Sequence, residues 1–252
     1  DEDQPYRIYY LSESSLEPLR IQKAQSTDEQ AGAIRDSVPF SLVQRKRKGI
    51  EDNYRSVYAG RWWWAKFNER KQREVIEIPD LFLADATSAI KLEASFLLAL
   101  NRGGIMEFLD QESRTLLGRI RISGRGEHTH QLQFPANQLT GDSILMRIDG
   151  DLNVAQHGGV FLQSLKWSYK RSTKPSQGQM LLETGQWADT GGLRLEGWSA
   201  PRAFGRSNDG SRIWDLSARL IKDETEENLW RFLSASLPAG CSHICFAEAD
   251  GA

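Results

Sequence analysis

Short stretches in which apolar and polar residues alternate dominate the chain from residue 74 to residue 170. The clearest is "AIKLEASFLLAL" (Ala89–Leu100), where Lys91, Glu93 and Ser95 separate apolar residues. On a β-strand this alternation directs the apolar side chains to one face and the polar ones to the other. Turn residues separate similar stretches at 74–78, 105–110, 118–123, 130–135, 143–149 and 159–170. The series predicts an all-β sandwich with no helix longer than about one turn.

Two of these stretches are close neighbours along the chain. The first ends at "NRGG" (Asn101–Gly104), and "IMEFLD" (Ile105–Asp110) follows directly. A short connection that contains glycine, placed between two strand patterns, is typical of a β-hairpin. We therefore expect these two strands to pair with each other.

A polar segment with Pro and Gly, "RSTKPSQGQ" (Arg171–Gln179), interrupts the pattern and predicts a linker or domain edge. Strand patterns resume at 181–187, 191–199, 212–221 and 228–237. We expect residues 1–172 to form a β-sandwich domain with an N-terminal extension. Residues 173–252 form either a second β segment packed on the first or part of a second sandwich.

The segment "GRWWWAKF" (Gly60–Phe67) places three tryptophans in a row. On a strand, Trp63 would point to one face, and Trp62 and Trp64 to the other. We expect Trp63 in the core of the sandwich. Trp62 and Trp64 are then either covered by a loop or a neighbouring domain, or exposed beside Arg61 and Asn68.

The overall composition narrows the classes of protein. The 252 residues carry a net charge of −2, from 32 basic and 34 acidic side chains, so no global field favours nucleic acid. No apolar run approaches the roughly 20 residues of a transmembrane helix. The chain begins at Asp1, which suggests a processed or cut protein, and the compartment stays open.

Histidine and cysteine are the residues that could hold a metal. On a strand, His128 and His130 of "HTH" would share one face, but a third ligand would have to come from far along the chain. "CSHIC" holds Cys241 and Cys245, which we expect as either a local disulfide or two free thiols. We predict no metal and no cofactor. The sequence contains no GxSxG, P-loop, GxGxxG or HExxH motif, so we predict no catalytic residue and favour binding over catalysis.

Two stretches carry a resemblance to known modules. "GVFLQSLKWS" (Gly159–Ser168) resembles the closing strand of galactose-binding-like jelly rolls. "GWSAPRAFGRSNDG" (Gly197–Gly210) is similar to a motif in β-sandwich modules of bacterial surface-polysaccharide proteins. Phe204 replaces a usual Trp, Arg202 stands where Glu is usual, and Ser207 stands where a second Trp is usual. The residues that match the motif are Gly197, Trp198, Pro201, Gly205 and Gly210. The resemblance covers about a third of the chain and implies an antiparallel jelly-roll sandwich in a glycan context.

Sugars offer C–H faces to aromatic rings and hydroxyls to polar side chains, a division found in many small-ligand sites. We therefore expect a non-catalytic module that binds glycans, or is associated with them, through exposed aromatics. The candidate ligand-binding residues are Arg61, Trp62, Trp64, Asn68, Trp198, Phe204, Arg206, Asn208 and Asp209.

Two alternatives stay open at the level of sequence. One is a structural or assembly protein that binds another protein chain through an aromatic patch, and the other is a polysaccharide-active β-sandwich enzyme. A glycan or another protein chain is the expected partner, without nucleic acid. The resemblance suggests a bacterial cell-surface or polysaccharide-assembly context.

Overall fold

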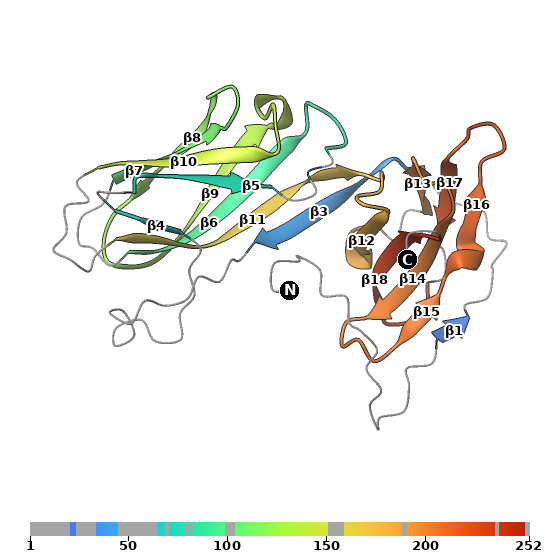
Figure 1. Cartoon of the computed structure of the whole chain (residues 1–252). Helices are drawn as coiled ribbons and strands as arrows, with labels where there is room; N and C mark the ends of the chain where they lie inside the picture. Colours follow the sequence, from blue (N-terminus) through green and yellow to red (C-terminus); the bar gives the residue numbers. More distant parts are fainter. Residues whose placement is uncertain are drawn as a thin grey trace.

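The structure is a computed structural model of the 252-residue chain, and Figure 1 shows two β-rich lobes joined by long strands. Within the described residues, the helical content is limited to 3-10 turns of three residues each. The prediction of an all-β fold is therefore confirmed. The structure describes residues 21–23, 34–44, 65–68, 71–78, 81, 83–98, 104–150, 159–187, 191–234 and 237–249.

The first lobe is a jelly roll. Its strands form four nested antiparallel pairs, β4 with β11, β5 with β10, β6 with β9 and β7 with β8. Nesting of this kind rolls the chain into two sheets, β5-β10-β7-β8 and β11-β6-β9 with β4 on the outer edge of β11. The strands are β4 (Ala65–Phe67), β5 (Arg73–Glu77), β6 (Ala89–Leu98), β7 (Gly104–Asp110), β8 (Leu116–Ile122), β9 (Gly126–Pro135), β10 (Ser143–Gly150) and β11 (Val160–Ser172).

The expected hairpin between β6 and β7 is wrong. β6 pairs with β9 and β11, whereas β7 pairs with β8 and β10, so the connection around "NRGG" crosses from one sheet to the other. Both strands direct apolar side chains inward, Phe96 from β6 and Phe108 from β7, and both side chains are fully buried in one core. Alternation identifies each strand correctly but does not identify its pairing partner.

The second lobe has its own core and two sheets, β1-β15-β14-β18-β12 and β16-β17-β13-β2. Two N-terminal strands join it by parallel pairing, β1 (Ile21–Lys23) with β15 and β2 (Ile34–Arg35) with β13. The division of the chain at residue 172 stays a prediction. The other strands are β12 (Gln179–Glu183), β13 (Gly192–Glu196), β14 (Pro201–Ser207), β15 (Ile213–Asp215), β16 (Leu220–Lys222), β17 (Leu229–Leu233) and β18 (Cys241–Glu248).

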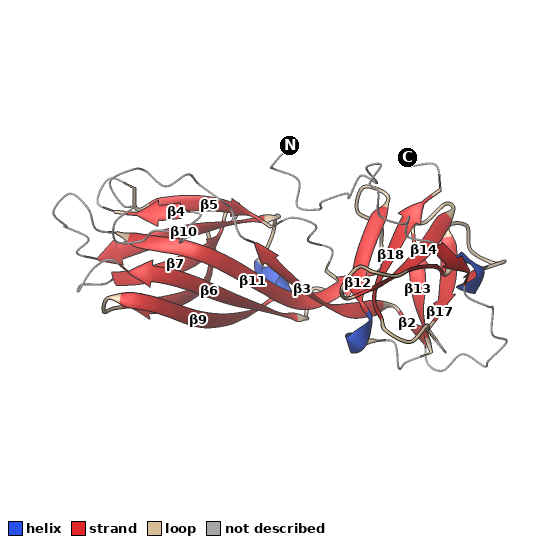
Figure 2. Ribbon diagram, turned by 90° about the horizontal axis from the view of Figure 1, so that it is seen from below, coloured by secondary structure: helices blue, strands red, loops and turns tan. Residues whose placement is uncertain are grey.

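Two strands connect the lobes, as Figures 1 and 2 show: β11 and its antiparallel neighbour β3 (Ser37–Gln44). Phe40 on β3 packs against both cores. The segment expected to be a linker is packed as well. Arg171 and Thr173 are 2% and 1% exposed, and Arg171 lies over the Phe40 ring at 5.5 Å. The junction is therefore a continuous packed region.

Candidate functional site

The outer face of the β14-β18-β12 sheet gathers several of the residues expected to bind a ligand. β14 alternates strictly, because Pro201, Ala203 and Gly205 are buried while Arg202 and Arg206 are exposed and Phe204 between them is half-buried. Pairing with β18 places Phe204 opposite Cys245, and pairing of β18 with β12 places Cys245 opposite Leu181. The result is an apolar row, Phe204–Cys245–Leu181, across three strands.

Polar rows flank this apolar row on both sides. Arg206 pairs with His243, which pairs with Glu183, and on the other side Arg202 pairs with Ala247, which pairs with Gln179. Neighbouring strands lie about 4.8 Å apart and same-face residues about 6.8 Å apart along a strand, so the rows form a closely spaced surface. We call this surface the Phe204 face, defined by Arg202, Phe204, Arg206, Gln179, Leu181, Glu183, His243, Cys245 and Ala247.

A close approach beneath the Phe204 face requires a glycine at position 205. A Cβ atom there would lie 2.8 Å from the Cys241 Sγ and 3.0 Å from the Leu216 Cδ1. Such contacts are too short to be accommodated without displacing the core side chains. Gly205 of the motif therefore has a packing role that does not depend on a ligand.

Asp209 stabilises the turn that follows β14. Its carboxylate accepts hydrogen bonds from the Ser207 hydroxyl at 2.6 Å and from the Ser211 backbone N–H at 3.0 Å. The Ser207 hydrogen bond, followed by those from Ser211, lowers the pKa of Asp209 to about 2. The chain reverses at Gly210, whose φ of +72° favours glycine. Asn208 and Asp209 are both exposed beside the Phe204 face, but the Asp209 oxygens are already engaged by the turn.

The expectation that Trp198 is an exposed ring is wrong. Its side chain is 0% exposed, and its indole N–H donates to the Thr173 carbonyl at 2.8 Å. The ring lies 6.2 Å from that of Phe246 in the second core. Trp198 therefore fixes the second core against the end of β11 and cannot stack on a ligand. The residues of the Gly197–Gly210 motif alone do not indicate that the Trp198 side chain is buried.

The other expected group does not join the Phe204 face. Arg61, Trp62, Trp63 and Trp64 lie outside the described residues. Asn68 follows β4 in the first lobe, where its side-chain oxygen accepts the Lys71 backbone N–H at 2.9 Å. β4 lies in the lobe away from the second core (Figure 1), so Asn68 and the Phe204 face belong to different surfaces.

The two cysteines are free thiols, one of the two outcomes that the sequence left open. Cys245 lies in the apolar row of the Phe204 face, whereas Cys241 packs against the second core on the other side of the sheet. Burial raises the pKa of both thiols. Their opposite orientations explain why no disulfide closes this short span.

The two histidines of "HTH" share one face of β9, as the alternation predicts. The rings of His128 and His130 are stacked, with centroids 6.3 Å apart, and His130 lies 6.5 Å from the Phe96 ring. Burial, and secondarily the neighbouring His128, lower the pKa of His130. Among the described residues, no group of three His, Cys, Asp or Glu side chains lies close enough to hold a metal.

Two further features of the surface carry clustered polar side chains. A cavity of about 380 Å³ at the junction is lined by Asp36, Lys174 and Glu196 beside Leu81 and Leu83, without His or Cys among its described lining residues. Nothing in this lining points to a particular ligand.

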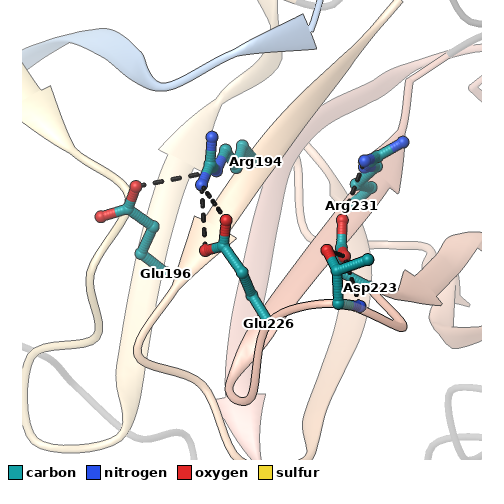
Figure 3. A network of polar contacts seen from close by, with 6 residues as sticks. Arg194, Glu196, Asp223, Glu226 and Arg231 are labelled. Carbon is teal, nitrogen blue, oxygen red and sulfur yellow. Dashed lines mark hydrogen bonds and ion pairs between the residues drawn. The ribbon is translucent and has the colours of Figure 1, made fainter.

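The other feature is the polar network of Figure 3, on the β13-β17 sheet. Arg194 binds Glu226 at 3.2 Å and lies 3.7 Å from Glu196, and Arg231 binds Asp223 at 2.8 Å. The Thr225 hydroxyl is the main reason that the pKa of Asp223 falls to about 2. The pairs of Arg194 are solvated and contribute little to stability, whereas the Asp223 side chain is 8% exposed and is held by Thr225 and Arg231.

None of the described helices could cross a membrane. No family model and no curated protein matches the sequence. Among solved structures, the chain is similar to dimeric latent PorU from Porphyromonas gingivalis, with a TM-score of 0.60 at 9% sequence identity. That match covers 91% of this chain but 22% of PorU, so the chain spans about a fifth of that protein's length.

A second solved structure is the N-terminal CBM22-1-CBM22-2 tandem domain of Paenibacillus barcinonensis Xyn10C, at 7% identity with a TM-score of 0.31. The match covers 88% of this chain and 98% of that one, but the TM-score is too low to support an argument. The similarity to PorU extends over both lobes, and at this identity it establishes the fold alone.

Proposed function

We propose that this chain is a non-catalytic binding module and that its Phe204 face binds a glycan. The observation that carries the proposal is the half-buried Phe204 ring on the outer face of the sheet, between exposed Arg202 and Arg206 on the same strand. A ring held from below by the sheet loses little conformational freedom when a ligand stacks on it. The guanidinium groups on both sides can donate hydrogen bonds to hydroxyl oxygens.

The division of the surface into rows also suits a sugar. The apolar row Phe204–Cys245–Leu181 offers contact to a C–H face, and the side chains of Arg206, His243 and Glu183 offer donors and acceptors beside it. Asn208 in the adjoining turn adds an exposed amide. In this proposal Asp209 shapes the turn, and Trp198 supports the sheet from below.

The pKa values of the carboxyl groups support a non-catalytic interpretation. A general acid needs a carboxyl whose pKa is raised towards neutrality. Each described carboxyl with a resolved shift has a lowered pKa, and each accepts hydrogen bonds from neighbouring side chains or backbone N–H groups. These residues are Asp85, Glu107, Asp110, Asp209, Asp223 and Glu248.

Arg61, Trp62, Trp64 and Asn68 remain part of the proposal as a separate contact. Because Asn68 follows β4 in the first lobe, we expect its substitution to act independently of substitutions on the Phe204 face. A bacterial cell-surface setting for the whole protein likewise remains a proposal.

The test is a glycan-array screen of the full chain, followed by calorimetric titration of the best ligand. We expect Phe204→Ala to weaken binding at least about tenfold, through loss of stacking, and Arg206→Ala to weaken it less. The matched control is Ile221→Ala, since Ile221 is 49% exposed on a different sheet of the same lobe. A glycan that binds Phe204→Ala and the unmodified chain equally well would exclude this face. A folded chain that binds no glycan on the array would refute the proposal itself.

A further inference from the structure

An unbroken apolar row crosses the outer face of the four-stranded sheet in the first lobe. Val75 on β5 pairs with Leu145 on β10, which pairs with Leu109 on β7, and Leu109 pairs with Leu116 on β8. Val75 and Leu116 at the two ends are 49% and 39% exposed, while Leu145 in the middle is 7% exposed. Four paired aliphatic residues therefore form a strip about 14 Å long, given the usual strand spacing, and a register shift between Phe108 and Leu109 places Leu116 opposite Leu109.

An arginine-rich row lies one step further along the same strands. Arg73 pairs with Arg147, Arg147 with Glu107, and Glu107 with Arg119. Glu107 accepts hydrogen bonds from both neighbouring arginines, at 2.8 Å from the Arg119 Nε. The Glu107 side chain is 9% exposed, whereas those of Arg119 and Arg147 are 61% and 42% exposed. Glu107 thus anchors two guanidinium groups that remain open to solvent.

The next row adds a fourth arginine, because Arg121 on β8 pairs with Ile105, which pairs with Asp149 on β10. Ile105 is 45% exposed. Beyond the opposite side of the apolar row, Glu77 ends β5. We call the surface the arginine face, formed by Arg73, Val75, Ile105, Glu107, Leu109, Leu116, Arg119, Arg121, Leu145, Arg147 and Asp149.

The arginines retain capacity for a ligand. A guanidinium carries five N–H donors, and Glu107 uses the Nε of Arg119 and the Nε and Nη2 of Arg147. Within the described residues, Arg73 and Arg121 form no ion pair. Paired donors on adjacent planar groups match carboxylates in a bidentate geometry. Charge complementarity therefore favours an acidic ligand on this side of the apolar row.

We infer that the arginine face docks a segment of another protein chain that carries aliphatic side chains beside Asp or Glu. The exposed apolar residues are Val, Leu and Ile, which complement aliphatic side chains and offer a sugar no ring to stack on. This distinguishes the surface from the Phe204 face on the other lobe. The inference goes beyond the proposed glycan function and does not depend on it.

A second copy of this chain fits the surface less well. Placing two arginine faces together would bring the row that contains Arg73 and Arg147 near the same row of the second copy. Like charges in an interface are unfavourable. The arginine face carries four arginines against two carboxylates, Glu107 and Asp149, and Glu107 is already paired with Arg119 and Arg147, so the occupant we propose supplies further carboxylates.

The experiment measures fluorescence anisotropy of a labelled 15-residue peptide of alternating Leu and Glu against the full chain. A Leu/Lys peptide and a Ser/Glu peptide of equal length are the comparison probes. We expect the Leu/Glu peptide to bind at least about tenfold more tightly than either, with an affinity that falls as salt rises. Equal binding of the Leu/Glu and Ser/Glu peptides would show that the apolar row makes no contribution and would overturn the inference.

The variants spare Glu107 and its two partners, since an unpaired buried carboxylate would endanger folding. We expect the double variant Arg73→Glu, Arg121→Glu to lower the affinity for the Leu/Glu peptide at least about tenfold. We expect Val75→Ser to lower this affinity severalfold. The matched control is Arg125→Glu, an exposed arginine in the turn between β8 and β9, with less than a twofold effect.

Two other results would assign the face to a different occupant and overturn the inference. One is competition by an alginate oligosaccharide, a carboxylated glycan, with the same affinity as the peptide. The other is a dimer in analytical ultracentrifugation that Val75→Ser dissociates. Failure of the glycan array would leave this test unaffected, because the two faces lie on different lobes.

Discussion

The two lobes are both β-sandwiches, but they draw their strands from the chain in different ways. All eight strands of the jelly roll follow one another between Ala65 and Ser172. The second lobe takes β12 to β18 from the C-terminal third and adds β1 and β2 from the N-terminal segment. Val38 on β3 is also buried in the second core. A sandwich that looks too short along the sequence is thus extended by strands from far away.

The difference also appears in what each lobe places on its surface. The first lobe presents aliphatic side chains with arginines, and the second presents the Phe204 ring with arginines and a polar turn. Three of the four described tryptophans of the second lobe, Trp187, Trp198 and Trp214, are buried, and Trp230 is half-buried against the same core. Tryptophan content alone is therefore a poor guide to a binding surface in this protein.

The largest expected loss of stability comes from replacing one buried tryptophan in each core, and it tests whether the lobes are independent. Trp167 and Trp198 are both 0% exposed, and both indole N–H groups donate a hydrogen bond, to Gln44 at 2.6 Å and to Thr173 at 2.8 Å. We expect replacement of either by Ala to reduce the free energy of unfolding by roughly 3–5 kcal/mol. The measurement is denaturant unfolding of the two variants.

Hydrogen exchange then shows which lobe each substitution affects. We expect Trp167→Ala to reduce amide protection mainly in the first lobe and Trp198→Ala mainly in the second, with some loss at the junction through Thr173. Uniform loss of protection across both lobes in each variant would mean that they unfold as one unit. A Trp198→Ala variant of unchanged stability would contradict the burial of this ring.

The strand pattern of the first lobe could be predicted because each strand is amphipathic over its own length. The register between strands could not, as the β6–β7 connection shows, because a two-residue period fixes a face and not a partner. β1 and β2 are three and two residues long, too short to give a periodic signal. Their parallel pairing over long sequence distances leaves no local turn motif.

Prediction of the candidate site shows the same limit. Arg206, Asn208 and Phe204 could be predicted from their residue types, but their neighbours Cys245 and Leu181 come from other strands. The burial of Trp198 could not be predicted from the motif, because it depends on Thr173 and Phe246, both distant in sequence. The arginine face could not be predicted from the sequence, because its residues are spread over four strands.

The next prediction compares how strongly the stability of each lobe depends on an aspartate that is ionised at neutral pH. Burial alone would raise the pKa of Asp110, but hydrogen bonds from Thr140 and Ser113 outweigh it and lower the pKa to about 2. The carboxylate is 0% exposed and ties the β7–β8 turn to the loop before β10. In the second lobe, Asp209 also has a pKa of about 2 but is exposed.

The direction in which stability changes with pH follows from the lowered pKa of Asp110 in the folded state. Ionised Asp110 stabilises the fold at pH values above its ordinary pKa near 4, and this stability is lost as the pH falls towards about 2. We expect Asp110→Asn to cost roughly 1.5–3 kcal/mol at neutral pH, and the difference from the unmodified chain to shrink on acidification. Chemical unfolding at pH 7 and pH 2.5 measures this, with Asp209→Asn as the exposed comparison. A cost that is independent of pH would assign the effect of Asp110 to packing and not to charge.

The smallest effect tests whether β3 contributes to both lobes. Val38 is 0% exposed in the second core, whereas Val43 on the same strand is 48% exposed. Removing two buried methyl groups by Val38→Ala should cost about 1–2 kcal/mol, and Val43→Ala under about 0.5 kcal/mol. Because Val38 packs with the second core, hydrogen exchange should quicken in β12 to β18 even though β11 is the one strand that β3 pairs with among the described elements. If the loss of protection were confined to β3 and β11, the N-terminal segment would be an attachment to the second lobe and not a part of its core.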